Sequence, residues 1–198
     1  MADATGGLIT LAAVRRALAG YQPQPAEAAG ARPAAVSLVL VEGPEGAEIL
    51  LIKRAERADD PWSGQIAFPG GRRNARDRDL LATAERETRE ETGVELAAAE
   101  RLGVLDDLAP RAATLPPVTV RPFVFALRRR PVLTINAEVQ RAFWVALARL
   151  SEPAVRSQVT LQLSDGERTL PAYRLGEDII WGMTERILTP FVHTITKI

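Results

Sequence analysis

The sequence predicts a mixed α/β sandwich, and three observations lead to this prediction. Strand-like runs occur both before and after a central helical segment at about residues 80–92. A second amphipathic segment, at residues 183–196, closes the chain with a helix. The strands and helices do not alternate regularly, which favours a mixed sheet over a regular parallel one. At 198 residues the chain is long enough to bury one substantial core.

Residues 1–33 are expected to form an N-terminal helix and a linker, and residues 34–198 the main domain. Ile9, Leu11, Val14 and Leu18 have the spacing of one helix face within residues 9–20. The stretch YQPQPAEAAGARPAA then breaks this pattern with proline and alanine. A homodimer contact through Leu11, Val14 and Leu18 is an alternative to packing within one chain.

The strands are expected mainly in the main domain. Residues 35–42 and 48–54 are β-rich and are joined by GPEGA, which predicts a hairpin. A third short strand is expected within GQIAFPGG, ending at the glycines. Further strand candidates follow at residues 118–129, 141–147, 159–163 and 169–175, and an Asp-Gly turn signal joins the last two.

The central helix is expected to run from Leu80 to Thr92. Asp77 and Asp79 are the two candidates for its N-cap, and Gly93 predicts its C-terminal end. The terminal helix has an apolar face formed by Ile187, Leu188, Phe191 and Ile195.

Composition excludes several classes of function. Lys plus Arg and Asp plus Glu both number 25, so the formal net charge is zero and overall basicity does not indicate a nucleic-acid partner. No apolar run approaches 18 residues, and residues 1–20 lack the pattern of a signal segment, so we expect a cytoplasmic protein that does not span a membrane. The chain has no cysteine and one histidine, His193, so carboxylates are the groups expected to carry any chemistry.

Three glutamates share one face of the central helix. Glu87, Glu90 and Glu91 lie three and four residues apart. At about 5 Å and an effective dielectric of about 20, each such pair repels by roughly 3 kcal/mol before screening. One interpretation is a solvated face with ion pairs such as Arg86–Glu90. The other is a divalent cation site, because Mg²⁺ prefers hard oxygen ligands.

The double glycine before this helix supports the second interpretation. Gly70 and Gly71 lack side chains, so the backbone there can approach the helix or a ligand closely and can offer a carbonyl oxygen. Taken alone, PGG more often marks a turn. Together with the glutamates it favours a metal site.

These residues resemble the signature of the Nudix hydrolases, which is Gly, five residues, Glu, seven residues, then Arg-Glu-apolar-x-Glu-Glu-x-Gly-apolar. RETREETGV, residues 86–94, matches its second half at the fixed polar and glycine positions. Thr88 replaces the usual apolar residue, which predicts a less firmly seated helix. Asp77 stands in the acidic position with eight residues before Arg86 instead of seven, and Asp79 is its rival.

The resemblance implies an α/β/α sandwich with a loop–helix–loop signature, and Mg²⁺- or Mn²⁺-dependent hydrolysis of a small-molecule diphosphate. By position, Glu87 and Glu91 would bind the metal, with a backbone ligand from Gly71 or, failing that, Gly70. Glu90 would be a third ligand or the base that activates water, and Arg86 would orient a carboxylate.

A second resemblance concerns the coenzyme A pyrophosphatase branch of this family. LLIKRAERADDPWSGQIAFPGG and IIWGMTERIL are similar to stretches of that branch, although Ile52, Ala55 and Asp60 depart from it. The resemblance implies hydrolysis of coenzyme A or its thioesters to adenosine 3′,5′-bisphosphate and a 4′-phosphopantetheine product. The alternatives are ADP-ribose, a nucleotide sugar, a dinucleoside polyphosphate, a nucleoside triphosphate, or a nucleotide-binding module without catalysis.

Coenzyme A carries a 3′-phosphate, so a site for it should contain cations. Arg54 and Arg72 are the candidates, with Arg73 beside them, although each is also explained as a surface charge. Trp181 and Trp62 are candidates for stacking on a base, although each is also explained as a packing residue. Glu138 would approach the metals from a second loop or form a salt bridge there.

Overall fold

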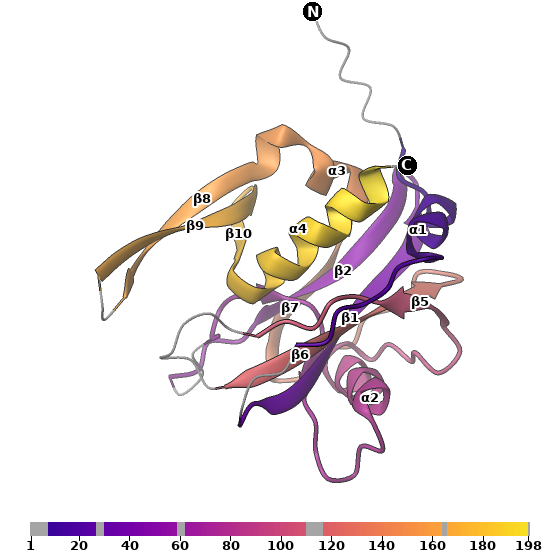
Figure 1. Ribbon diagram of the computed structural model, residues 1–198, viewed down its shortest axis with the longest axis horizontal. Helices are drawn as coiled ribbons and strands as arrows, with labels where there is room; N and C mark the ends of the chain where they lie inside the picture. Colours follow the sequence, from indigo (N-terminus) through magenta and orange to yellow (C-terminus); the bar gives the residue numbers. More distant parts are fainter. Residues whose placement is uncertain (1–7, 27–29, 59–61, 110–116, 164–165, 198) are drawn as a thin grey trace, which may run out of the picture.

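The computed structural model describes residues 8–26, 30–58, 62–109, 117–163 and 166–197. A mixed sheet of seven strands forms the centre of the molecule (Figure 1). Its strands are β1 (Arg32–Gly43), β2 (Gly46–Arg54), β3 (Ile66–Ala67), β4 (Gly70–Arg72), β5 (Glu100–Val104), β6 (Val118–Leu127) and β7 (Val139–Ala146). A separate antiparallel sheet contains β8 (Arg156–Leu163), β9 (Gly166–Leu175) and β10 (Asp178–Trp181). The helices are α1 (Leu11–Leu18), α2 (Leu80–Thr92), α3 (Leu147–Ser151), a 3₁₀ turn at Pro153–Val155, and α4 (Gly182–Thr196).

Strand β1 is the organising strand of the main sheet. It runs parallel to β6 along most of its length, from the pair Arg32–Val118 to the pair Val41–Leu127. Its other edge pairs antiparallel with β4 near its start and with β2 near its end. The sheet is therefore mixed, which confirms the predicted fold class.

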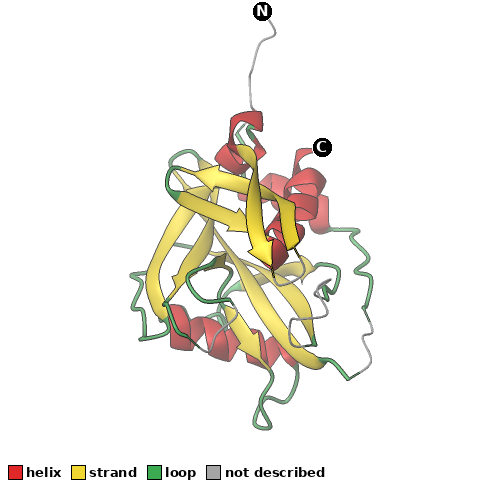
Figure 2. Cartoon of the chain, turned by 90° about the vertical axis from the view of Figure 1, so that its left-hand side faces the viewer, coloured by secondary structure: helices red, strands yellow, loops and turns green. Residues whose placement is uncertain are grey.

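Helices cover both faces of the sheet, as Figure 2 shows from the side. Side chains alternate along β1, so Leu38 and Leu40 enter the core beneath α1, α3 and α4, whereas Ala35 and Val39 enter the core beneath α2. The described residues thus form three layers, α/β/α, with one helix on the second face.

Helix α1 is part of this core. Thr10 caps it by accepting a hydrogen bond from the backbone N–H of Ala13 at 3.2 Å. Leu11, Val14 and Leu18 are buried in the same cluster as the apolar face of α4. These three side chains are therefore not exposed for a dimer contact, so a homodimer stays a prediction without that basis. The division at residue 33 also stays a prediction.

The strand expected within residues 64–71 is two short strands. β3 pairs with β2, and β4 pairs with β1. Between them, Pro69 has no N–H for a ladder, but its carbonyl accepts a hydrogen bond from the backbone N–H of Ser37 at 2.8 Å. The chain thus crosses from one strand of the sheet to the next, which places Gly70 and Gly71 against β1.

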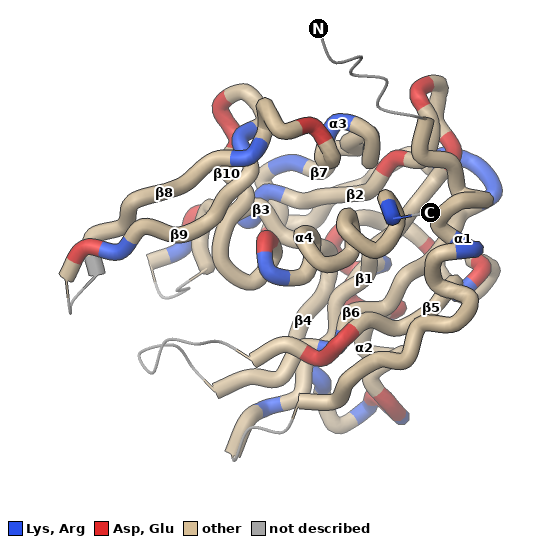
Figure 3. The backbone as a smooth tube through the Cα atoms, turned by 45° about the horizontal axis from the view of Figure 1, so that its top comes forward, with Lys and Arg blue, Asp and Glu red and all other residues tan. Residues whose placement is uncertain are grey.

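The second sheet was only partly expected. The β8–β9 ribbon projects away from the body of the molecule (Figure 1), and β10 leads directly into α4. Basic and acidic residues are interspersed along the chain in the view of Figure 3. No helix in the described ranges is long and apolar enough to cross a membrane.

Candidate metal and substrate site

A cavity of about 450 Å³ lies where the Gly70–Gly71 turn, α2 and the start of α4 meet, within the size range of small-ligand pockets. Its wall is apolar on one side and carries charged or polar groups on the other. The apolar lining includes Trp62, Phe68, Val118, Val120, Met183 and Ile187. The polar lining includes Arg54, Gln65, Arg72, Glu87, Glu91, Glu138 and Thr184.

Helix α2 has the predicted bounds, Leu80–Thr92, because both of its ends are specified locally. Asp79 is the N-cap and accepts a hydrogen bond from the backbone N–H of Ala82 at 2.7 Å. Gly93 ends the helix with a φ of 72°, a left-handed conformation that glycine adopts without strain. Of the two predicted N-cap candidates, Asp79 is the correct one.

Polar side chains seat α2 on the sheet. Thr88 is fully buried, and its hydroxyl donates to Ser37 Oγ on β1 at 2.8 Å. Ser37 Oγ in turn donates to the carbonyl of Ala84 at 3.3 Å. The departure at Thr88 therefore replaces an apolar contact with two hydrogen bonds, and the looser seating expected from the sequence is not what the structure shows.

The two glycines allow close approaches that a side chain would block. A Cβ atom on Gly70 would lie 2.3 Å from the carbonyl oxygen of Ala35. A Cβ atom on Gly71 would lie 2.5 Å from the carboxyl carbon of Glu87. At Gly70 the contact is with backbone, so glycine is required there, whereas a side chain at position 71 would displace the Glu87 carboxylate from its place beside the turn.

Glu91 is the most buried carboxylate of the site, with 2% of its surface exposed. It accepts a hydrogen bond from the backbone N–H of Gly70 at 2.8 Å, and Arg54 Nη1 lies 3.8 Å from its other oxygen. Burial raises the pKa of Glu91 to about 8, because the hydrogen bond and Arg54 offset only part of the desolvation. A cation beside this carboxylate would stabilise its charged form.

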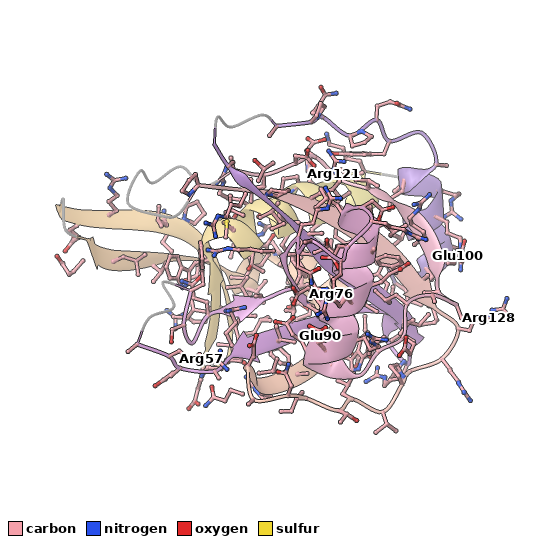
Figure 4. The ribbon with its side chains drawn as sticks, turned by 90° about the horizontal axis from the view of Figure 1, so that it is seen from below. Arg57, Arg76, Glu90, Glu100, Arg121 and Arg128 are labelled. Carbon is pink, nitrogen blue, oxygen red and sulfur yellow. The ribbon has the colours of Figure 1, made fainter. Side chains whose placement is uncertain are left out.

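Glu87 lines the cavity beside Glu91, while Glu90 lies at its rim. Burial raises the pKa of Glu87, although Arg86 opposes this effect. Glu90 is 47% exposed and is outside the cavity lining formed by the described residues. Figure 4 shows Glu90 on α2 from below. Glu87 and Glu91 therefore line the same cavity, and Glu90 lies beside Glu87 outside that lining in the described structure.

Arg86 and Asp77 form the support of this cluster. Asp77 is buried and binds Arg86 through two hydrogen bonds of 2.8 Å each. Arg86 also contacts Glu87 at 2.8 Å and Glu90 at 3.1 Å. The Arg86 guanidinium holds the pKa of Asp77 well below its usual range. Asp77 therefore occupies the acidic position of the signature despite the extra residue, and it orients Arg86 from outside the cavity lining of the described residues.

The available donors fit a divalent cation. The side chains of Glu87 and Glu91, with a backbone oxygen of the glycine turn, supply hard oxygen ligands of the kind that Mg²⁺ and Mn²⁺ bind. Within the described ranges, no three acidic or histidine side chains are already grouped closely enough to hold a metal. Glu87 and Glu91 would hold such a cation, with water and substrate oxygens at other positions.

Of the predicted substrate-binding residues, Arg54, Arg72 and Gly70 line the cavity, and Trp181 does not among the residues that the structure describes. Trp181 ends β10, and the chain turns at Gly182 so that α4 presents Met183, Thr184 and Ile187 instead. A substrate contact by Trp181 therefore stays a prediction, without a place in the cavity lining of the described residues.

Two other predicted residues have clear positions. Glu138 lines the cavity and pairs with Arg57, whose Nη1 lies 3.3 Å away, so the predicted salt bridge is present and the approach to the metals stays a prediction. Arg73 donates to the carbonyls of Asp77 and Arg78, which makes it a loop support.

Trp62 lines the cavity, and so do residues of α4 that the sequence did not single out. Trp62 precedes the glycine turn in the same segment that supplies Arg54, and this proximity was the available signal. Met183 and Ile187 are four residues apart, which places them on one face of a helix. Thr184 Oγ1 also donates to the carbonyl of Ile66 at 3.0 Å, which ties α4 to β3 beside the cavity.

Comparison with known proteins agrees with this site. The NUDIX domain model matches residues 31–162. The mitochondrial coenzyme A diphosphatase NUDT8 of Mus musculus is 34% identical over 162 residues, covering 77% of this chain and 74% of that protein. The human NUDT8 protein is 31% identical over 183 residues, covering 89% of this chain and 74% of its own length. The uncharacterized protein C14C4.10c of Schizosaccharomyces pombe is 35% identical over 131 residues, which are 63% of this chain but only 40% of that protein.

Solved structures show the same fold. A MutT/nudix family protein from Enterococcus faecalis superimposes with a TM-score of 0.55 at 23% identity, covering 82% of this chain and 61% of that one. A C. elegans Ap4A hydrolase superimposes with a TM-score of 0.50 at 20% identity, covering 60% of this chain and 82% of that one. With the family model, the relatives and the site geometry in agreement, the chain belongs to the Nudix hydrolases, a family of enzymes that hydrolyse diphosphates linked to another group.

Proposed function

We propose that this protein hydrolyses the diphosphate linkage of a nucleoside diphosphate derivative in a reaction that depends on Mg²⁺ or Mn²⁺. The observation that carries this proposal is the pair Glu87 and Glu91 lining one cavity beside the glycine turn. Both have a pKa that burial raises, so a bound cation would stabilise the carboxylates in their charged form and would also attract a polyanionic substrate.

Glu87, Glu91 and the carbonyl of Gly71 are the groups that we propose hold the metal. When bound, the metal would neutralise the charge of the diphosphate and lower the pKa of water. Arg86 fixes the Glu87 carboxylate through a 2.8 Å hydrogen bond and is itself fixed by Asp77. Arg54 lies 3.8 Å from Glu91 and faces the same cavity, where it would bind a phosphate oxygen.

Glu138 is our candidate for the proton acceptor. It lines the cavity with Glu87 and Glu91, whereas Glu90 lies at the rim in the described structure. In the proposed step a water oxygen attacks a diphosphate phosphorus, the bridging P–O bond breaks, and the water proton passes to the Glu138 carboxylate. The role predicted for Glu90, as a third ligand or base, would then belong to Glu138.

Coenzyme A or its thioesters are the proposed substrates. Two relatives that match over three quarters or more of this chain are named coenzyme A diphosphatases. The cavity combines arginines for phosphates with an apolar wall formed in part by Met183 and Ile187, which suits a substrate with both anionic and apolar ends. The products would be adenosine 3′,5′-bisphosphate and 4′-phosphopantetheine or its acyl form.

The test is a hydrolysis screen in Mg²⁺ buffer with coenzyme A, ADP-ribose, dinucleoside polyphosphates and nucleoside triphosphates, with products identified by mass. Release of adenosine 3′,5′-bisphosphate from coenzyme A supports the proposed substrate. Turnover of another diphosphate alone overturns the substrate, and inactivity toward the whole panel overturns the reaction.

Two matched comparisons test the residues. Glu91→Gln is expected to lower kcat/KM by about 10²–10⁴-fold, because a metal ligand contributes several kcal/mol to the transition state. The exposed Glu95→Gln, the same change beyond the helix, should have no effect. Glu138→Gln should lower kcat by more than Glu90→Gln, and the reverse order would return the base to Glu90.

A further inference from the structure

The pair Trp62 and Arg72 differs from the other arginine–aromatic contacts of the described residues. The guanidinium carbon lies 4.2 Å from the ring centroid in the pair Arg156–Tyr173, 4.4 Å in Arg141–Phe143 and 5.4 Å in Arg130–Trp144. In the pair Arg72–Trp62 the distance is 6.0 Å, the longest of the four. Both Arg72 and Trp62 line the cavity, whereas the other three pairs lie outside its lining in the described structure.

Among the arginines that line the cavity, Arg72 is the one that forms no salt bridge with a carboxylate of the described residues. Arg54 lies within 4.0 Å of Glu91, and at the rim Arg57 pairs with Glu138. No salt bridge of Arg72 to a described acidic residue lies within that distance. Its side chain is exposed at the end of β4, so its guanidinium is available to a ligand.

The distance between Trp62 and Arg72 is close to the width that a planar ring would need in order to fit between them. Two stacking contacts of about 3.5 Å each require about 7 Å between the outer planes. The Arg72 guanidinium carbon lies 6.0 Å from the Trp62 ring centroid, so a modest movement of the flexible arginine side chain would open a gap of that width. The closer pairs near 4.2–4.4 Å would have to open far more.

From this spacing we infer that Trp62 and Arg72 hold the nucleobase of the substrate between the indole ring and the guanidinium plane. The inference rests on the proposed function for the rest of the ligand. Arg72 directly follows Gly71, so the base would lie within one arginine side chain of the proposed diphosphate site. Bases stack on aromatic rings and on guanidinium planes, and each stacked base typically contributes about 1–3 kcal/mol.

The binding preference of the protein for a base tests this inference. Isothermal titration in Mg²⁺ buffer would compare AMP with ribose 5-phosphate, which has the same ribose and phosphate but no base. We expect AMP to bind about 5- to 150-fold more tightly, which is the stacking contribution expressed as a ratio. Trp62→Leu should remove most of this preference and leave the affinity for ribose 5-phosphate unchanged.

Matched variants separate stacking from general effects. Trp181→Leu removes a tryptophan outside the cavity lining of the described residues and should keep the preference for AMP. Arg72→Lys retains the positive charge but removes the planar guanidinium, so it should reduce the preference for AMP. Arg141→Lys makes the same change outside the cavity lining of the described residues and should not reduce it. Trp62→Phe retains an aromatic ring and should keep part of the preference, which guards against a Trp62→Leu variant that does not fold.

The inference is overturned if Trp62→Leu weakens both ligands equally or leaves the preference for AMP intact. Its failure is distinguishable from that of the proposed function. If the preference depends on Trp62 and Arg72 but no diphosphate is hydrolysed, the base site stands and the enzymatic proposal fails. If coenzyme A is hydrolysed and the preference is unaffected in Trp62→Leu, the reverse holds.

Discussion

Helices α2 and α4 cover opposite faces of the same sheet and are held to it in different ways. The buried side chains of α4 are mostly apolar, including Ile187, Leu188, Phe191, Val192 and Ile195. The buried residues of α2 are Thr83, Ala84, Thr88, Glu91 and Thr92, of which one is apolar. Apolar burial is non-directional, whereas hydrogen bonds fix an orientation. The comparison shows that the face carrying the carboxylates relies on directional contacts, and the opposite face relies on apolar burial.

The largest expected effect on stability lies on the α4 face. Phe191→Ala removes a side chain that is 1% exposed, and such changes typically cost about 3–5 kcal/mol through lost burial and the resulting cavity. Urea unfolding would measure this loss. His193→Ala, an exposed change on the same helix, should alter the unfolding free energy by less than about 0.5 kcal/mol.

This first prediction also tests the division of roles. The kcat of the Phe191→Ala protein that remains folded should be close to that of the wild type. A kcat that fell in proportion to stability would show that the α4 face positions the catalytic groups after all.

The next largest effect is expected from the support of Arg86. Asp77→Asn should lower kcat/KM by about 10- to 100-fold, as is typical when a residue that orients a ligand is changed. Loss of the ion pair also allows Arg86 to leave Glu87, so the Mg²⁺ concentration needed for half-maximal rate should rise. Asp79→Asn is the control, because asparagine caps a helix about as well as aspartate. Equal rates for the two variants would contradict this role of Asp77.

A smaller effect is expected where α2 meets β1. Thr88→Val keeps the shape but leaves Ser37 Oγ without its donor, which should cost about 1–3 kcal/mol of unfolding free energy. The double variant Ser37→Ala/Thr88→Val removes both groups and should recover most of that loss. Thermal or urea unfolding of the two variants measures the difference. If the double variant were instead less stable than Thr88→Val alone, the hydrogen bond between Thr88 and Ser37 would not be what holds α2 on the sheet.

A further effect is a pH dependence of the metal-free protein. The pKa of Glu91 is raised from 4.5 to about 8, so between these values the folded state binds more protons than the unfolded state. The contribution of Glu91 to stability is therefore present below about pH 4.5 and lost as pH rises through 8. Each kcal/mol lost lowers the Tm by about 2–4 °C in a chain of this size.

Calorimetry at pH 5 and pH 8.5 would detect this decrease in Tm. Added Mg²⁺ should raise the Tm more at pH 8.5, where protons no longer compete for the carboxylate. In Glu91→Gln both the pH dependence from this group and the larger Mg²⁺ effect should disappear. Their persistence would assign the titration to another group.

Much of the fold could be predicted from the sequence because its signals are local. Asp79 and Gly93 mark the two ends of α2, and the hairpin of β1 and β2 follows from two β-rich runs and a short turn. Strand β5 was missed because Glu100–Val104 is short, lies at the edge of the sheet and lacks apolar alternation. Strand β10 was missed because the four residues before α4 merge into the helical pattern.

The site was predictable where it follows the helix and less so where it depends on tertiary contacts. Helical spacing brought Glu87 and Glu91 to one face. It also gave the pair Arg86–Glu90, but it could not show that Asp77, nine residues before Arg86, would bind the same guanidinium. Trp62 lines the cavity and Trp181 is outside its lining in the described structure. This difference depends on the direction in which the chain turns at each tryptophan, which no local sequence pattern encodes.

Strand β1 gives the site a common frame of reference. Ala35 and Val36 pair with Gly71 and Gly70, and the next residue, Ser37, bonds both Pro69 and α2. The glycine turn and helix α2, which form the proposed metal site, are thus both attached to residues 35–37 of β1. A displacement of this stretch would move both of them together. A change in the position of this stretch would therefore alter the place of the whole metal site before it altered the distance between the backbone oxygen and the carboxylates.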